Sequence, residues 1–584
     1  MASKVAEIAE AFVQDGPAGW IGNLWDQWNN QRAEKVAEWL ELRNFVFATD
    51  TSTTTNASLP WKNSTTIPKL CQIRDNLHSN YKSALFPNDE WLTWKGYSQS
   101  DSVLEKASAI ESYMKNKNRQ SGDQVEISKL LYDYIDYGNA FAMPTFESRY
   151  KELSNGQKVP DYVGPKVVRI SPLDIVFNPI ASSFRESPKI VRYIRTIGDL
   201  RRMAMDNPEQ SFWEDALKNR EQWRERMGSY TKEDFNKAVA YSVDGFGSLY
   251  EYLQSNYVEI LVFYGDYHDV ETGELRTNQQ ITVVDRCFTA DERDIESWFG
   301  HAPIYHVGWR FRPDNLWAMG PLDNLVGMQY RIDHLENLKA DAQDLIVHPP
   351  LKIIGEVEEF EWRPGAEIHI DENGDVAEVS SSMNGILSAS NEIQMLEDRM
   401  EAYAGAPREA MGIRTPGEKT AFEVQQLQNA AGRIFQEKIT NFEVSLLEPL
   451  LNAMLETARR NMEGVDVIRV MNNDIGVETF RQVTKEDITA NGLLRPIGAR
   501  HFAKQANDLQ NLIGVFSSPL AQFIAPHTSA KELTRVINDV LHLDGYEIFR
   551  TNIAIEEQAE TQMAMNQASE DMELMQQTGA EDVQ

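Results

Sequence analysis

The chain has 584 residues, with 57 Lys and Arg against 89 Asp and Glu, which gives a formal net charge of −32. Apolar residues make up 42% and charged residues 25%, the balance of a globular protein and not of a disordered one. The acidic excess excludes a protein that holds nucleic acid over a broad face, because such binding needs lysines and arginines that displace counterions.

The cysteines and the hydropathy exclude further classes of protein. Cys71 and Cys287 are far apart and have no metal-ligand neighbours, which excludes a disulfide framework and a cysteine zinc site and fits a reducing compartment. No stretch approaches about 18 consecutive apolar residues, so no membrane span is predicted. The N-terminus carries acids and no apolar run, so it does not resemble a signal peptide.

The first 140 residues are predicted to be mainly helical, because apolar residues recur at spacings of three and four. Residues 1–50 are expected to form two helical pieces that break at Gly16-Pro17, followed by a polar loop that ends at Pro60. Three further helices are predicted, after Pro68, over Asp101–Asn116 and from Val125 to about Tyr137. Several of the 13 tryptophans lie here, and we attribute them to core and interface packing.

From Ala140 onward the pattern changes to short β-prone runs with one helical interruption. Strands are predicted at Phe141–Phe146, Lys166–Ile170, Val258–Tyr267 and Gln280–Asp285, within Ser171–Pro179 and around Ile304–Val307. The interruption, residues 197–238, has arginines and acids in near balance, so we interpret it as helices with a solvated face.

The centre of the chain has the most informative pattern. Gly320-Pro321 opens a helical run that ends at about Val347, and some 26 residues at 1.5 Å each correspond to a rod of roughly 40 Å. His348-Pro349-Pro350 ends the rod, and a strand-rich insert follows, in which Asn373-Gly374 is typical of a hairpin turn. A helix is predicted to return from about Glu392 to Ala404.

A short loop, Gly412–Thr420, then leads into the longest helical pattern, which reaches about Met462. We expect a kink near Gly432 or Pro449, because glycine weakens a helical turn and proline removes a backbone hydrogen bond. Strands follow near residues 466–470, and helices are predicted from Ala499 to an acidic end that has no Lys or Arg after Arg550.

The loop at residues 412–420 comes nearest to a catalytic motif. A phosphate-binding P-loop needs Gly, four residues and then Gly-Lys-Ser/Thr directly after a strand. Here Glu418 separates Gly417 from Lys419 and adds a negative charge, and the preceding segment is predicted to be helical. A nucleotide phosphohydrolase that uses Gly412–Thr420 stays an alternative, but we predict that the protein is not an enzyme.

Two weaker candidates for a metal or hydrolytic site are the pair His301 and His306 and the cluster Gly265-Asp-Tyr-His-Asp269. No carboxylate or cysteine at metal-ligand spacing accompanies the histidines, and Gly273 marks the cluster as the end of a hairpin. Nucleophile elbows, zinc-protease helices and dinucleotide fingerprints are absent from the sequence. We therefore predict no metal and no cofactor.

The order of a helical rod, a strand-rich insert, a returning helix, a cationic loop and a very long helix places the insert at the tip of a projecting hairpin. Such a hairpin has little core of its own, so its apolar stripe needs neighbouring copies. At these residues the sequence resembles the portal proteins of tailed bacteriophages, the ring-shaped head-to-tail connectors, of the short-tailed type. The segments that carry the resemblance are Gly320–Leu325 through Asp341–Asp344, Gly412–Val424, Leu447–Leu451, Leu77–Pro87 and Tyr137–Ala140, within about residues 1–500.

The resemblance implies an α+β subunit, mainly α with β-rich inserts, that assembles as a ring. Its parts would be a wing (1–318), a stem helix (319–347), a clip (348–390), a second stem helix (391–411), a tunnel loop (412–420), a long kinked helix with the wing return (421–498) and a helical crown with an acidic tail (499–584).

The resemblance also implies the function. Portal proteins form dodecamers at a capsid vertex, through which double-stranded DNA enters and leaves the head. The implied partners are the terminase large subunit, a tail adaptor protein, and the major capsid and scaffolding proteins. The protein would be assembled in the host cytoplasm and reside in the virion, with no membrane partner.

The site residues follow from the same correspondence. Arg414 and Lys419 would contact DNA in the channel, and Gly412, Pro416 and Gly417 would form the hinge of the tunnel loop. The clip residues expected to dock partners are Lys352, Glu358, Glu359, Trp362 and Arg363. An acidic wall would repel DNA and leave the two loop cations as sparse contact points. A non-portal virion scaffold protein stays a further alternative.

Overall fold

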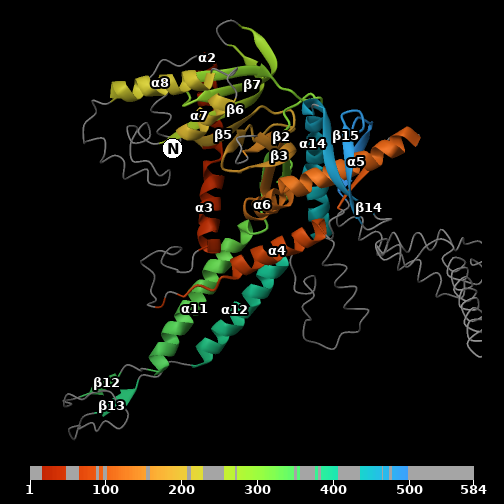
Figure 1. Cartoon of the computed structure of the whole chain (residues 1–584). Coiled ribbons are helices and arrows are strands. Elements are labelled where there is room, and N and C mark those ends of the chain that lie inside the picture. Colours follow the sequence, from red (N-terminus) through yellow and green to blue (C-terminus); the bar gives the residue numbers. More distant parts are fainter. Residues whose placement is uncertain are drawn as a thin grey trace, which may run out of the picture.

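The structure is a computed structural model that describes residues 16–47, 63, 65–86, 91–96, 101–152, 158–206, 212–227, 256–269, 273–347, 351–354, 375–378, 383–404, 435–462, 464–472 and 477–496. Within these residues the protein mixes helices and sheets, which confirms the α+β class. Figure 1 shows a body of helices and sheets from which two helices project together, with a pair of strands at their far end. These elements are α11 (Val326–Val347), α12 (Met383–Tyr403), β12 (Leu351–Ile354) and β13 (Asp375–Glu378).

One layer of the body is an antiparallel sheet in the order β4-β5-β6-β7-β8. Its strands are β4 (Ile175–Phe177), β5 (Lys189–Thr196), β6 (Tyr257–His268), β7 (Leu275–Val284) and β8 (Phe288–Asp294). Strand β6 is buried on both faces, because successive side chains of a strand point to opposite sides. Ile260 and Val262 share a hydrophobic cluster with α7 (Ile197–Asp206) and α8 (Phe212–Met227), whereas Leu261 and Phe263 share one with α2 (Gly16–Gln31).

The N-terminal helices differ in part from the prediction. The break expected at Gly16-Pro17 lies at the beginning of α2, because a proline in the first helical turn lacks an N–H that would have no partner there. A second interruption, at Arg32, separates α2 from α3 (Ala33–Phe47) and has no signal in the sequence. The buried Arg32 guanidinium donates to the carbonyls of Pro172, Leu173 and Ile175 at 2.6, 2.6 and 2.7 Å, which fixes this junction against the loop before β4.

A second antiparallel sheet has the order β3-β2-β9 and packs against helices that carry the main hydrophobic core. The strands are β2 (Asn139–Glu152), β3 (Lys158–Ile170) and β9 (Tyr305–Gly308), and the helices before them are α4 (Lys69–Leu85), α5 (Asp101–Ser121) and α6 (Asp123–Asp136). These elements confirm the predicted helices and strands. Helix α5 runs past its predicted end at Asn116 to Ser121, and Gly122, with φ of 73°, makes the turn into α6.

Three pairs of short strands complete the described part of the body. They are β1 (Leu92–Gly96) with β16 (Gly492–Pro496), β14 (Val465–Asn472) with β15 (Val477–Thr484), and β10 (Arg310–Arg312) with β11 (Asn315–Met319). The first pair places Leu92 opposite Pro496, so it joins the N-terminal and C-terminal parts of the chain.

The long C-terminal helical pattern is described from residue 435 to residue 461. It passes through a π-helical turn, η4 (Glu443–Leu447), into α14 (Glu448–Asn461). The Glu448 N–H bonds to the carbonyl of Glu443, five residues earlier, and Pro449 follows directly. A π turn at this place accommodates the proline, because the proline has no N–H to donate and its ring needs room beside the preceding turn.

We call the projecting helices α11 and α12 the stalk. Helix α12 spans Met383–Tyr403, so it begins before the predicted Glu392, and the insert before it is shorter than the 348–390 expected for the clip. Its end agrees with the predicted Ala404 and comes before residue 411, the limit expected for the second stem helix. The earlier start includes Gly385, Ser388 and Ser390, but packing of Ile393 and Met400 in the main core outweighs their low helix propensity. Pro407 in the sequence agrees with an end near Ala404, since the residue before a proline disfavours a helix.

Candidate functional site

The stalk is the feature that corresponds to the predicted projecting hairpin. Helix α11 has 22 residues, which at 1.5 Å each gives about 33 Å. It contacts α12 along its length, and the two chain ends that leave them meet in the β12–β13 pair (Figure 1). The β12–β13 pair therefore lies at the end of the stalk away from the body.

The stalk leaves apolar side chains uncovered. Leu338 and Leu345 on α11 are 38% and 48% exposed, and Leu387 and Met395 on α12 are 61% and 51% exposed. Leu338 and Leu345 are seven residues apart and so lie on one face of α11, as the positions of a helix–helix seam do. A pair of helices cannot cover both sides of itself, so these side chains are available to another surface.

The tip of the stalk is only partly described. Strand β12 pairs with β13 so that Lys352 stands opposite Ala377, and Lys352, Ile353 and Ile354 are exposed. Lys352 is thus accessible to solvent. The other predicted clip residues, Glu358, Glu359, Trp362 and Arg363, lie outside the described residues.

The root of the stalk is fixed by polar residues of α11 that bind the backbone of the extended segment before α4 and of the first turn of α4. Going along α11, the residues are four apart, and we call them the polar ladder: Gln329, Asp333, Asn337 and Asp341. Their side-chain oxygens accept the backbone N–H groups of Leu70, Ile67, Thr65 and Asn63 at 3.2, 3.1, 2.7 and 3.0 Å, respectively.

Helix geometry explains this ladder. Four residues of an α-helix advance about 6.0 Å, and two residues of extended chain advance about 6.6 Å. Every fourth residue of α11 therefore meets every second residue of the segment, as Asp341, Asn337 and Asp333 meet Asn63, Thr65 and Ile67. The amides also donate in return: Gln329 to the carbonyl of Ile67 at 2.6 Å and Asn337 to that of Thr65 at 3.1 Å.

Asp333 is the exceptional member of the ladder. Its side chain is completely buried, and its Oδ1 accepts both the Ile67 N–H and the Gln329 amide. Its Oδ2 is buried and has no hydrogen-bond partner. This desolvation raises the pKa of Asp333 to about 6, although the two hydrogen bonds act in the opposite direction.

Three further contacts join the root to the helices of the body. Lys69 on α4 forms a buried ion pair of 2.6 Å with Glu401 on α12. Lys35 on α3 forms an ion pair of 2.6 Å with Asp323, at the start of the 3₁₀ turn η3 (Asp323–Leu325) that precedes α11. The chain before η3 also passes so close to Gly138 that a Cβ on this glycine would overlap the backbone of Gly320. The stalk is thus fixed to α3, α4 and the α6–β2 turn.

The predicted DNA-contact residues lie outside the described residues. These are Arg414 and Lys419 together with Gly412, Pro416, Gly417 and the expected kink residue Gly432. The segment Gly412–Thr420, considered for a P-loop, lies there too. Pro449, the other expected kink residue, is described and follows the π turn η4.

Two residues of the weaker candidates for a metal site, His306 and Asp266, pack against or hydrogen-bond other residues of the fold. His306 stacks on Phe141 with ring centroids 4.5 Å apart and hydrogen-bonds Asn139 Oδ1 at 3.0 Å, and burial lowers its pKa to about 3. Asp266 accepts the backbone N–H of Asn278 at 2.8 Å across the β6–β7 hairpin. Within the described ranges, His, Cys, Asp and Glu side chains form no group of three that could hold a metal ion.

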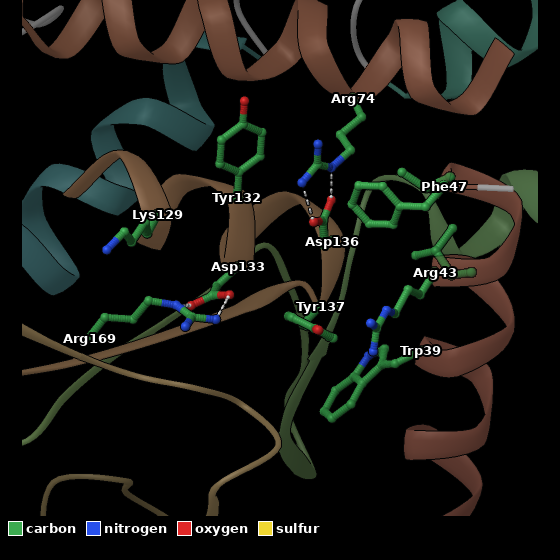
Figure 2. A pocket seen from close by; sticks show the side chains of 12 residues that line it. Trp39, Arg43, Phe47, Arg74, Lys129, Tyr132, Asp133, Asp136, Tyr137 and Arg169 are labelled. Atoms are coloured by element: carbon green, nitrogen blue, oxygen red, sulfur yellow. Dashed lines mark hydrogen bonds and ion pairs between the residues drawn. The ribbon is translucent and has the colours of Figure 1, made fainter. Parts of the chain in front are cut away.

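The structure also contains a cavity of about 230 Å³ that sequence reasoning missed. It lies between α3, α4, α6 and the end of β3, and Figure 2 shows the side chains that line it. Arg74 binds Asp136 through two hydrogen bonds of 2.6 and 2.8 Å, and Arg169 binds Asp133 in the same way at 2.5 and 2.7 Å. Burial raises the pKa of Asp133 to about 7 in spite of the Arg169 contact.

One pattern in the sequence could have indicated this cavity. Lys129, Tyr132, Asp133, Asp136 and Tyr137 recur at spacings of three and four, so they share a face of α6, opposite the apolar residues that enter the core. A helix face with cations, carboxylates and tyrosines is typical of a solvated surface. The cavity forms only because α3 and α4 approach this face in the fold.

Neither a protein-family model nor a curated protein sequence matches this chain. None of the helices in the described part of the chain has both the length and the apolar character that crossing a lipid bilayer requires.

Proposed function

We propose that this chain is the subunit of a portal ring, the channel at a capsid vertex through which double-stranded DNA is packaged and later ejected. The stalk is the observation that carries the proposal. Two helices project from the body with a strand pair at their end, and they leave Leu338, Leu345, Leu387 and Met395 uncovered. A closed ring gives every stalk two neighbours and covers these side chains in all subunits.

The charge of the stalk supports the same proposal. Helices α11 and α12 together carry eight acidic and three basic residues. A channel wall with this excess repels the phosphate backbone, with a range of about 8 Å at physiological salt, and so permits DNA to slide without lasting contact. Arg414 and Lys419 then serve as the sparse contacts of the tunnel loop.

The partners follow from the direction of the stalk. In a ring of about twelve subunits all tips point the same way, so the exposed β12 with Lys352 lies where the terminase large subunit docks first and a tail adaptor afterwards. The body then meets the major capsid and scaffolding proteins. The assembled ring resides in the virion, and the chain itself carries out no catalysis.

Electron microscopy of the purified full chain tests the proposal. Closed rings with a central hole and about twelve subunits are expected, and mass photometry is expected to give the matching mass. A monomer that persists at micromolar concentration would overturn the proposal, and open assemblies of variable size would favour the virion scaffold instead.

Two loop variants test the proposed DNA contacts. Arg414→Ala and Lys419→Ala are expected to form normal rings but to alter DNA packaging or retention. If both variants fail to form rings, the loop is structural and does not face DNA. Nucleotide binding by the pure protein that is lost in Lys419→Ala would instead favour the phosphohydrolase.

A further inference from the structure

We infer that the cavity between α3, α4 and α6 binds a carboxylate side chain from a second copy of this chain. The inference rests on the self-association in the proposed function, but it concerns a different surface from the stalk. Figure 2 shows four basic side chains around the cavity, those of Arg43, Arg74, Lys129 and Arg169. Two carboxylates, Asp133 and Asp136, line the cavity with them, and Lys129 also pairs with Glu126 at 2.6 Å. The lining residues themselves are still positive in sum, in a chain whose net charge is −32.

Asp133 and Asp136 occupy only part of the N–H donors of Arg169 and Arg74. A guanidinium has five N–H groups, and each paired arginine uses two of them in its contact with an aspartate. The remaining donors of Arg74 have a further contact of 3.4 Å to Asp75. Arg43 is exposed and makes no hydrogen bond or ion pair with another described residue. An additional anion therefore finds guanidinium donors that the described residues leave unused.

The walls of the cavity favour a side chain over a larger ligand. Pockets for small organic molecules usually measure about 300–1,000 Å³, and this cavity, at about 230 Å³, is smaller. Its rim is aromatic: the Arg74 guanidinium lies 4.1 Å from the centre of the Tyr132 ring and 5.1 Å from that of Phe47. These rings restrict Arg74 and partly shield the site from water, which strengthens a charge-assisted hydrogen bond.

The position of the cavity points to a neighbouring copy as the source of the carboxylate. Helix α3 ends at Phe47, whose ring is 61% exposed, and both α3 and α4 contact α11 at the root of the stalk. A neighbour that covers the apolar side chains of the stalk therefore lies beside the cavity. Because the chain has 89 acidic residues and 57 basic ones, such a neighbour presents mainly carboxylates.

A charge reversal at the rim tests the inference. Arg43→Glu in the full chain is expected to weaken self-association at least tenfold by mass photometry, with an unchanged circular dichroism spectrum and melting temperature. Arg201→Glu is the matched control, because Arg201 is an exposed arginine on α7 with one ion pair, and it is expected to associate as the wild type does. Raising the salt concentration should weaken the wild type more than Arg43→Glu.

A second experiment distinguishes the source of the carboxylate. Sodium glutamate at millimolar concentration is added to wild type and to Arg43→Glu, and thermal stability and association are followed. If glutamate stabilises the wild type alone and the two proteins associate equally, the cavity holds a free anion and the inference is overturned. Wild-type stability that does not respond to glutamate, together with weaker association of Arg43→Glu, supports it.

The outcomes also separate this inference from the proposed function. If Arg43→Glu forms rings as readily as the wild type, the inference is wrong and the proposed function is unaffected. If the wild type forms open assemblies and Arg43→Glu does not, the inference is supported and the proposed ring is wrong. A wild type that stays monomeric overturns both.

Discussion

The backbone N–H of Ile67 donates to Asp333 Oδ1 at 3.1 Å, across a separation of 266 residues in the sequence. This bond lies in the middle of the polar ladder, so the extended segment before α4 and the root of the stalk form one unit. Asp333 is completely buried, and its Oδ2 has no hydrogen-bond partner. The stalk root therefore contains a carboxylate whose charge is poorly compensated.

We predict that Asp333→Asn stabilises the protein at neutral pH. The pKa of Asp333 is raised to about 6 by burial, so between about pH 4 and 6 the folded state keeps a proton that the unfolded state releases. The stability from this group is present below pH 4 and is lost as the pH rises to 6. An asparagine retains the acceptor oxygen without the charge, so we expect a gain of about 2 kcal/mol at pH 7.5 and little change at pH 4, measured by urea unfolding.

Asp333→Ala is the control for this prediction. It removes the acceptor of the Ile67 N–H and the Gln329 amide and should cost about 1–3 kcal/mol at pH 4, and less at pH 7.5, where it also removes the buried charge. If Asp333→Asn is as unstable as Asp333→Ala at pH 7.5, the ionised carboxylate is required and the prediction is wrong.

Gly138→Ala should destabilise the protein far more than Gly273→Ala. Both glycines have left-handed backbones, with φ of 66° and 70°, so each substitution carries a conformational cost of about 1–2 kcal/mol. A Cβ at Gly273 meets open space, whereas one at Gly138 overlaps the backbone of Gly320 at the entrance to the stalk. We expect a total loss above about 3 kcal/mol for Gly138→Ala by urea unfolding. Equal losses of stability in the two variants would show that the backbone at Gly320 moves aside without a cost in free energy.

Lys69→Met tests the buried connection between α4 and α12. The Lys69 and Glu401 side chains are only 5% and 8% exposed and 2.6 Å apart, and removal of one member leaves a buried charge. We expect a loss of about 3 kcal/mol in the free energy of unfolding. Lys218→Met, at a lysine that is 63% exposed and 3.4 Å from Asp215, should change stability by less than about 1 kcal/mol. Similar effects of the two changes would mean that the buried pair is dispensable.

Much of the local structure is predictable from the sequence, because it depends on residues that are neighbours in the chain. Apolar spacing indicates α4 and α6, and the alternation in β6 sends Ile260 and Leu261 to opposite faces of the sheet. Gly320-Pro321 marks the approach to the stalk. These elements follow from periodicity and from turn chemistry, which a single sequence displays.

The contacts that fix the stalk root are not predictable in this way. Gln329, Asp333 and Asn337 read as the polar side of an exposed rod, yet they are completely buried against the segment before α4. The cavity likewise arises only where α3 and α4 approach α6. In both places polar residues face another part of the chain, and a helical pattern of polar residues does not distinguish solvent from a polar partner.

Leu345→Glu is predicted to disrupt assembly without unfolding the chain. Leu345 is 48% exposed and lies on the same face of α11 as Leu338, so the proposed ring buries it against a neighbouring stalk. A carboxylate there adds charge to an already acidic helix pair and must lose its water on assembly, which we expect to cost at least about 2 kcal/mol per interface, or thirtyfold in affinity. Leu275→Glu, at a leucine that is 59% exposed on β7, is the control that leaves the stalk unchanged. Mass photometry distinguishes two outcomes: smaller species for Leu345→Glu alone support stalk-to-stalk packing, whereas intact rings for both variants place the interface elsewhere on the subunit.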